Sequence, residues 1–111
     1  MANIYKNAKV DLTNNSETAV LTVPSDSRAV IKSIVVSEDS GNADSITLTI
    51  TDASSNVFSL FKTKAVSANA TVELLSQPLV LQESEILKAT AATGNRLHIV
   101  CLLYTSDAAD E

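Results

Sequence analysis

This sequence contains one cysteine, one histidine, no tryptophan and only two glycines among its 111 residues. A single cysteine provides no disulfide framework and no cysteine-paired zinc site. With so little glycine, tight turns must rely on Asn, Asp and Ser, which tolerate unusual backbone angles and bond to their own main chain. We therefore expect a soluble domain, made in a reducing cytoplasm, that folds on a hydrophobic core without metals, cofactors or disulfides.

The sequence also lacks long apolar runs and clusters of basic residues. Its longest apolar run, 99–104, is too short to span a bilayer, and residues 1–12 lack the apolar stretch of a signal peptide. The eight Lys and Arg residues are scattered through a chain of net charge −5. No basic stripe is left to hold phosphates, so we expect neither a membrane nor a nucleic-acid partner.

The chain is rich in Thr, Ser, Val and Ala, which favour strands over helices. In 45–52, Ile46, Leu48 and Ile50 alternate with threonines, the pattern of a strand with one wet face. Residues 18–24 and 96–100 alternate in the same sense. The segment 64–75 fits either a helical face or a loop followed by a strand, and we favour the strand because its surroundings are β.

Two segments, 28–37 and 56–62, carry apolar side chains on both faces. Strict alternation places Val30, Ile34 and Val36 on one face and Ile31 and Val35 on the other. In 56–62 it places Val57 and Phe61 opposite Phe58 and Leu60, and we expect both phenylalanines to be buried. Such strands are either covered on both sides or lie at a subunit contact. The predicted protein–protein interface therefore consists of Val30, Ile31, Ile34, Val35, Val36, Phe58 and Leu60, some of which must belong to the core.

Polar turns separate these runs at intervals of 8–12 residues. Seven to nine short strands spaced in this way predict an all-β, single-domain antiparallel β-sandwich. Alternation alone does not distinguish a jelly-roll-like strand order from an immunoglobulin-like one, because both give the same runs.

Catalytic and metal sites are poorly supported by the sequence. His98 is the only conventional base, and it lies in a strand between Leu97 and Ile99, directed away from the residues that they bury. The carboxylates of Glu83 and Glu85 flank a turn, where acids are usually solvated. We predict no enzyme activity and no small-molecule substrate.

One loop gathers acids that could supply oxygen ligands for calcium. Glu38, Asp39 and Asp44 lie in 38–44, but they lack the alternating spacing of a helix–loop–helix calcium site. A solvated loop is the better interpretation, and we predict no metal site.

The last eleven residues, CLLYTSDAADE (101–111), differ from the rest of the chain. They resemble the translation of a transposon-type adapter used in shotgun sequencing libraries, over their whole length. That resemblance implies a β-sandwich domain over 1–100 and a non-native tail over 101–111, with the natural strand continuing after Val100 in unknown residues. It also implies a metagenomic source. The alternative is a natural strand followed by an acidic end.

Residues 1–100 resemble small structural proteins of tailed bacteriophages, especially marine ones. The resemblance lies in MANIYKNAKVDLT (1–13), LTVPSDSRAVIKSIVVSEDSG (21–41) and PLVLQESEILKATAAT (78–93). The third stretch departs from the L-V-L-E-x-G-D-x-L turn of such proteins, because Ser84 replaces the glycine and Glu85 the aspartate. We therefore expect this turn to be built differently.

The resemblance implies a virion structural protein, made in the cytoplasm of a host bacterium, that acts as a head decoration subunit or a neck or tail component. Its partners would be further copies of itself and other virion proteins from the capsid, neck or tail. The alternative function is a carbohydrate- or cell-surface-binding sandwich of a host-adsorption device, which requires exposed aromatic residues. Tyr5, Phe58 and Phe61 are the only aromatic residues outside the tail.

Overall fold

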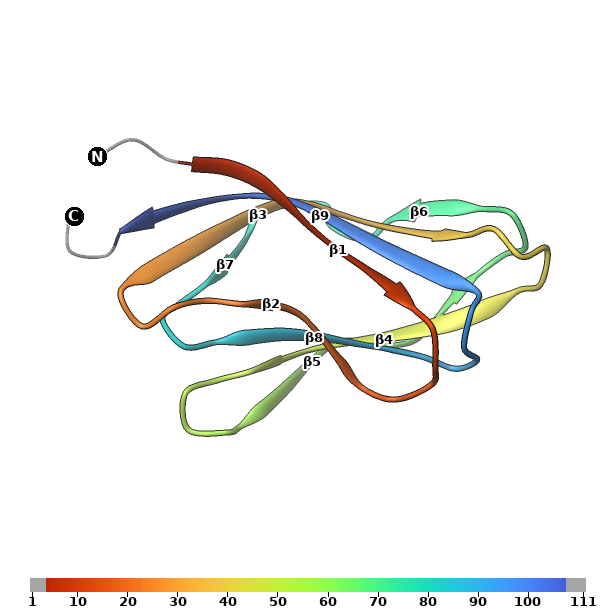
Figure 1. Cartoon of the computed structure of the whole chain (residues 1–111), viewed down its shortest axis with the longest axis horizontal. Helices are drawn as coiled ribbons and strands as arrows, with labels where there is room; N and C mark the ends of the chain where they lie inside the picture. The colour runs from red at the N-terminus through yellow and green to blue at the C-terminus, as the bar shows by residue number, and fades with distance from the viewer. Residues whose placement is uncertain (1–3, 108–111) are drawn as a thin grey trace.

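A computed structural model describes residues 4–107, and all regular secondary structure in this range consists of β-strands (Figure 1). The nine strands confirm the predicted all-β class. They are β1 (Ile4–Leu12), β2 (Thr18–Thr22), β3 (Ser27–Glu38), β4 (Asp44–Thr51), β5 (Val57–Val66), β6 (Thr71–Glu73), β7 (Leu79–Leu81), β8 (Ile86–Ala91) and β9 (Leu97–Asp107).

The strands form two antiparallel sheets packed face to face, which appear as two layers in Figure 1. The larger sheet has the order β1-β9-β3-β6, with β7 also paired to β3, and the smaller sheet has the order β2-β8-β4-β5. Counted outward from the β4–β5 turn, each earlier strand pairs with a later one, so that the pairs are nested. The pairs are β4 with β5, β3 with both β6 and β7, β2 with β8, and β1 with β9. Nested pairs rolled into two sheets make a jelly roll, so the strand order decides between the two predicted alternatives.

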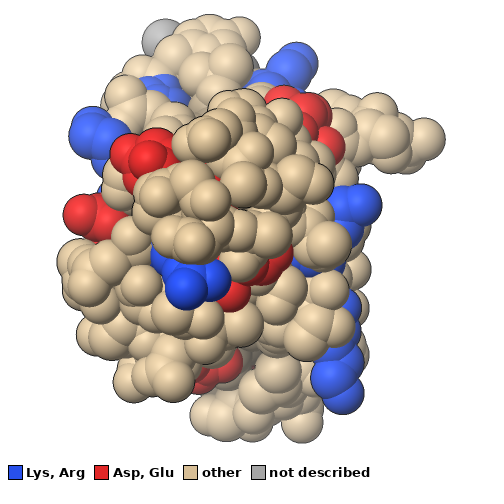
Figure 2. Space-filling model, turned by 90° about the vertical axis from the view of Figure 1, so that its right-hand side faces the viewer, with Lys and Arg blue, Asp and Glu red and all other residues tan. Residues whose placement is uncertain are grey.

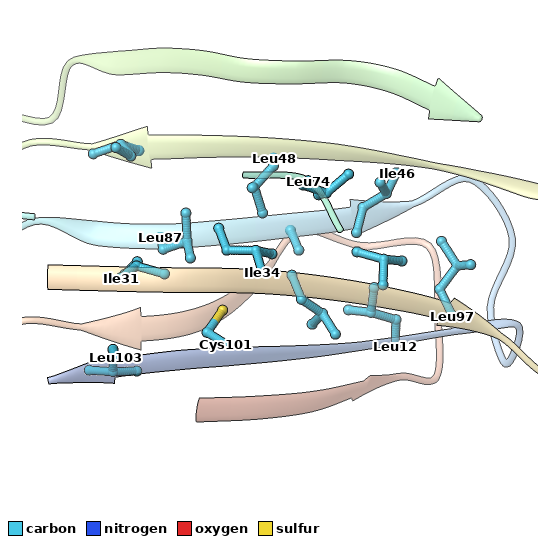
Figure 3. Packing of buried hydrophobic residues seen from close by; sticks show 14 of the residues in the cluster. Leu12, Ile31, Ile34, Ile46, Leu48, Leu74, Leu87, Leu97, Cys101 and Leu103 are labelled. Atoms are coloured by element: carbon cyan, nitrogen blue, oxygen red, sulfur yellow. The ribbon is translucent and has the colours of Figure 1, made fainter. Parts of the chain in front are cut away.

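The core lies between the two sheets and is filled by alternate residues of their strands (Figure 3). Ile46 and Leu48 of β4 are fully buried, as the alternation of 45–52 predicted, but Thr49 and Thr51, on the face predicted to be wet, are buried as well. On β9, Leu97, Ile99 and Leu103 point inward from every second position and are also fully buried. Each such leucine or isoleucine contributes about 1.5–3 kcal/mol through the area that it removes from water.

A β-bulge in β3 changes which of its side chains reach the core. The pairing with β9 shifts between Ile31 and Ser33, so Lys32 is an extra residue without a partner of its own. Ile31, Ile34 and Val36 consequently all face the core with no exposed surface. Two predictions are therefore wrong, that Ile31 lies on the face opposite Ile34 and Val36 and that Val30 shares their face, because strict alternation cannot anticipate an inserted residue.

Glu73 stabilises the backbone around this bulge. Its carboxylate accepts hydrogen bonds from the Ser33 hydroxyl, the Ile34 N–H (2.8 Å) and the Leu75 N–H (3.1 Å). Burial would raise the pKa of Glu73, but these three hydrogen bonds outweigh it and hold the pKa below its usual value. The carboxylate lies at the gap between β6 and β7, where β3 lacks a neighbouring strand on that side.

The ambiguous segment 64–75 is not helical. Its first residues end β5 at Val66, and Thr71–Glu73 form β6, as the sequence analysis favoured. The turn at 82–85 keeps a left-handed residue: Ser84 has φ +67°, the conformation that glycine adopts most readily. The replacement of the glycine by Ser84 has therefore not removed the left-handed position from this turn.

Residues 101–107 are the last seven of the eleven residues of β9 and pair with both neighbouring strands. Cys101 is opposite Ala8 of β1 and Ile34 of β3, and Leu103 is opposite Lys6 and Ile31. Residues 108–111, which complete the adapter-like segment, lie outside the described residues. Whatever its origin, the segment provides most of a strand that lies between β1 and β3.

Candidate assembly surface

The outer face of the larger sheet carries a row of apolar side chains that crosses four strands. Tyr5 of β1 is paired with Tyr104 of β9, Tyr104 with Val30 of β3, and Val30 with Val80 of β7. Paired residues share a face, so these four side chains form one line perpendicular to the strands. Further along the same face, Val100 of β9 is opposite Val35 of β3, and Leu102 lies between the two rows.

These side chains are well exposed for apolar residues. Tyr5 is 69% exposed, Val80 53%, Leu102 49% and Val100 42%, while Val30, Val35 and Tyr104 are half-buried among them. The Tyr5 and Tyr104 rings are in contact, with centroids 5.3 Å apart. We call this surface the outer patch: Tyr5, Val30, Val35, Val80, Val100, Leu102 and Tyr104. Exposed apolar patches are candidate binding sites for another molecule.

The seven residues of the predicted interface divide among three environments. Val30 and Val35 belong to the outer patch, whereas Ile31, Ile34 and Val36 are core residues. The other two, Phe58 and Leu60, lie on β5 at the edge of the smaller sheet. Binding at these positions stays a prediction, but the seven side chains do not form one surface.

The burial predicted for Phe58 is wrong. Its side chain is 56% exposed because β5 is an edge strand whose pairing with β4 is irregular. Leu60 and Phe61 instead pack against the core and line a hollow of about 240 Å³ beside Leu74 and Leu79. The hollow opens between β5 and the β6–β7 connection.

His98 lies on the outer face, as predicted, at the polar end of the larger sheet. Its Nε2 is 3.1 Å from Asp11 Oδ1 and its Nδ1 is 3.7 Å from Asp39 Oδ2. Ser37 is paired with His98 across β3 and β9, so a serine, a histidine and an aspartate share one row. Both imidazole nitrogens face carboxylates, however, and this arrangement leaves neither directed at Ser37 to activate it as a nucleophile.

The two acids at the 82–85 turn are held by different partners. Glu83 lies 3.4 Å from the Arg28 guanidinium, while Glu85 accepts a hydrogen bond from the Gln82 N–H (2.8 Å). A hydrogen bond from its own backbone N–H and the charge of Arg28 together lower the pKa of Glu83. Each carboxylate is thus occupied in holding the turn.

The acids of the 38–44 loop are also directed to separate partners. Asp44 accepts a hydrogen bond from the Thr93 N–H (3.1 Å), and Asp39 lies beside His98. Within residues 4–107, no three His, Cys, Asp or Glu side chains are grouped closely enough to hold a metal ion.

Glu38 has a structural role that the sequence analysis missed. It is only 2% exposed, although we expected it in a solvated loop. Its carboxylate accepts hydrogen bonds from the Ser40 N–H (2.8 Å) and hydroxyl, the Gly41 N–H (3.1 Å) and the Asn69 N–H (2.9 Å). It therefore joins the β3–β4 loop to the β5–β6 turn. Burial alone would raise the pKa of Glu38, but the four hydrogen bonds lower it to about 2.

Cys101 is a buried core residue. Burial and the nearby negative charge of Glu73 raise the pKa of its thiol to about 12, so the reactive thiolate is scarce at neutral pH.

On the side of the molecule seen in Figure 2, acidic and basic side chains are interspersed over a largely uncharged surface. None of the described residues forms a helix that is long and apolar enough to cross a membrane.

Comparison with known proteins gives no match by sequence: neither a protein-family model nor a curated protein matches the chain. Solved structures do match its fold. A chain from the acid-stable capsid of Helicobacter pylori bacteriophage KHP30 has a TM-score of 0.58 at 12% identity, over 96% of this chain and 89% of that one. A chain from the T13 particle of infectious bursal disease virus also reaches 0.58, at 9% identity, over 95% of this chain and 31% of that one.

A third structure of similar fold comes from a bacterial fibre. A chain from the disulfide-linked pili of Bacillus endospore appendages has a TM-score of 0.56 at 8% identity, over 95% of this chain and 88% of that one. At such low identities these similarities establish the fold and not the role. The structural neighbours thus include phage and viral capsid proteins of jelly-roll type.

Proposed function

We propose that this protein is a non-enzymatic structural protein of a phage virion, a head decoration subunit or a neck or tail component. It would be made in the cytoplasm of the host bacterium and act by symmetric self-assembly and by binding to capsid, neck or tail proteins. The observation that carries this proposal is the outer patch. The fold of the capsid proteins described above supports it.

The outer patch has the composition that an assembly contact needs. Its centre is apolar and partly aromatic, while Lys9, Asp11 and His98 lie at its polar end. Apolar centres with polar rims are typical of protein–protein interfaces. The patch is four strands wide and a few residues long, so its area is only a few hundred Å². A stable pairwise complex buries more, roughly 800 Å² of surface on each partner. Such a contact gains strength when many copies engage one particle together.

Five members of the patch lie outside the adapter-like segment, namely Tyr5, Val30, Val35, Val80 and Val100. Tyr5 joins the other four only through Tyr104, which lies in that segment. Val30, Val35, Val80 and Val100 share one face through pairings that involve neither Leu102 nor Tyr104.

The experiment begins with long-read sequencing of the source DNA across this gene and its neighbours. Portal, capsid or tail genes alongside would name the particle proteins to test, and flanking bacterial surface genes would contradict the proposal. The protein is then mixed with particles assembled from those neighbours and sedimented. We expect it to sediment with the particles and the Val80→Lys variant to lose most of its binding.

Val57→Lys is the matched control, since Val57 is a similarly exposed valine (61%) on the smaller sheet. We expect this variant to bind particles as the unaltered protein does. Equal binding by both variants, or no binding by the unaltered protein, would refute the outer patch as the contact.

A second candidate, carbohydrate or cell-surface binding, is favoured by the exposure of Phe58 and Tyr5. The two aromatic residues lie on different sheets, so they do not form one stacking platform. Titration with host cell-wall glycans tests it: saturable binding that Tyr5→Ala or Phe58→Ala abolishes would favour this candidate over the virion contact.

A further inference from the structure

His98 lies between two carboxylates that come from different parts of the chain. Its Nε2 is 3.1 Å from Asp11 Oδ1, near the end of β1, and its Nδ1 is 3.7 Å from Asp39 Oδ2, in the loop between β3 and β4. The first distance is within reach of a hydrogen bond from a ring N–H, whereas the second is too long for one. Since His98 itself belongs to β9, the three residues bring two strands and a loop together.

The number of protons on the imidazole decides how many of these contacts it can make. A neutral imidazole has one N–H donor and one nitrogen lone pair, so it can donate to only one of the two carboxylates. The lone pair of its other nitrogen then faces carboxylate oxygens, which are acceptors themselves. An imidazolium has two N–H donors and a positive charge, so it can donate to both carboxylates at once. The distances of 3.1 and 3.7 Å fit the neutral form, with the proton on Nε2.

We propose that His98 forms a proton-dependent contact with Asp39, which we call the latch. When the ring is neutral it contacts Asp11 alone. When it gains a second proton, Nδ1 donates to Asp39 and draws the loop of residues 39–43 toward β9. Because imidazole side chains ordinarily gain this proton between roughly pH 8 and pH 5, the latch forms in mild acid and is lost as the pH rises. The ring lies at the polar end of the outer patch, but the inference does not rest on the proposed function.

The basic side chains beside His98 are directed to other partners. Lys9 lies on the same face of β1 as Asp11, but its Nζ donates a hydrogen bond to Asn7 Oδ1 (3.0 Å). Arg96, just before β9, donates to the carbonyl oxygen of Ala43 (3.0 Å). In the row of His98, β3 and β6 contribute uncharged neighbours, Ser37 and Thr71. A proton gained by the ring therefore acts chiefly on the two carboxylates that face it.

The loop is anchored at both ends by carboxylates of its own. Glu38 accepts hydrogen bonds from the Ser40 N–H (2.8 Å) and the Gly41 N–H (3.1 Å), and Asp44 accepts one from the Thr93 N–H (3.1 Å). Because the pKa of Glu38 is lowered to about 2, this carboxylate keeps its charge over the whole range in which imidazole side chains titrate. A change in the loop between pH 8 and pH 5.5 would therefore not come from Glu38.

Hydrogen exchange of the Ser40 and Gly41 amides measures the latch, because these amides exchange only when the loop leaves Glu38. After correction for the intrinsic effect of pH on exchange, we expect their protection in the unaltered protein to rise a few-fold from pH 8 to pH 5.5. The change is modest because contacts between exposed charges are weak. In Asp39→Asn and in His98→Gln, we expect the same protection at both pH values. A response that persists in Asp39→Asn, or no response in the unaltered protein, would overturn the proposal.

The matched control is Asp26→Asn, which removes the same charge from an exposed turn between β2 and β3. We expect this variant to keep the full response at Ser40 and Gly41. If Asp26→Asn also abolished the response, the overall charge of the protein and not the latch would control the loop, and the proposal would be wrong. Exchange is measured on the protein alone, so this result does not depend on whether the outer patch binds particles.

Discussion

Replacing Leu103 with alanine tests whether residues beyond Val100 belong to the folded core. The side chain of Leu103 is fully buried and points between the sheets from β9, opposite Ile31 of β3 (Figure 3). Removing a buried leucine side chain costs the lost burial plus the energy of the cavity that remains, about 2–5 kcal/mol in all. We expect the free energy of unfolding to fall by about 3 kcal/mol, a large part of the 5–15 kcal/mol typical of one domain.

The matched control is the adjacent residue. Leu102 has the same side chain on the same strand but points outward and is 49% exposed. Leu102→Ala should change stability by no more than about 1 kcal/mol. Equilibrium unfolding in urea, followed by far-UV circular dichroism, measures both: with a slope of about 1–3 kcal/mol per molar, Leu103→Ala should lower the midpoint by about 1–3 M.

Equal effects of the two substitutions would refute the reasoning, because an unpaired or frayed segment would not distinguish its inward side chains from its outward ones.

The same alternation constrains the natural sequence. We still propose that 101–111 derives from an adapter. If reads of the source DNA replace these residues, we expect apolar residues at positions 101 and 103, since both side chains face the core.

Two further predictions concern a carboxylate and a glycine. Because the pKa of Glu38 is lowered to about 2 in the folded protein from a usual 4.5, the stability that it contributes is present above pH 4.5 and is lost as the pH falls toward 2. Thermal unfolding of Glu38→Gln across pH 7 to 2 should therefore show a lower Tm at neutral pH and a flatter decline in acid, and parallel curves would contradict this. A Cβ on Gly94 would lie 2.6 Å from the Thr13 carbonyl oxygen, so Gly94→Ala should destabilise the protein by about 1–3 kcal/mol in urea unfolding. Gly41→Ala, which meets no atom within 4 Å but keeps a positive φ, should cost only about 1 kcal/mol, and a larger loss than at Gly94 would be inconsistent with the clash.

The sequence was sufficient to predict the fold class because burial in a sandwich follows a period of two. Ile46, Leu48 and Ile50 could be assigned to the core from their alternation with threonine alone. The faces of β3 could not, since one inserted residue at Lys32 reverses the alternation, and nothing in the local composition marks it. Strand order was equally inaccessible, because it depends on pairings between distant segments.

Prediction of the candidate site depended on the same non-local information. Val30 and Val35 were recognised as possible contacts because β3 is apolar on both faces. Val80 and Val100 were not, since each is an isolated apolar residue in its own strand and joins the outer patch only through pairing across the sheet. Glu38 was misjudged for a related reason: one of the amides that bind its carboxylate belongs to Asn69, thirty-one positions away.

The nested strand pairing also determines the order in which this chain can fold. The β4–β5 hairpin closes a short loop, whereas β1 must wait for β9, because Ile4 is paired with Thr105. Since long loops must close before distant pairs are gained, we expect folding to spread outward from the middle of the chain and to take milliseconds to seconds. During synthesis, β1 and β3 emerge long before their shared partner β9 is made. The apolar faces of β3 are therefore open to chaperones or to aggregation until β9 emerges.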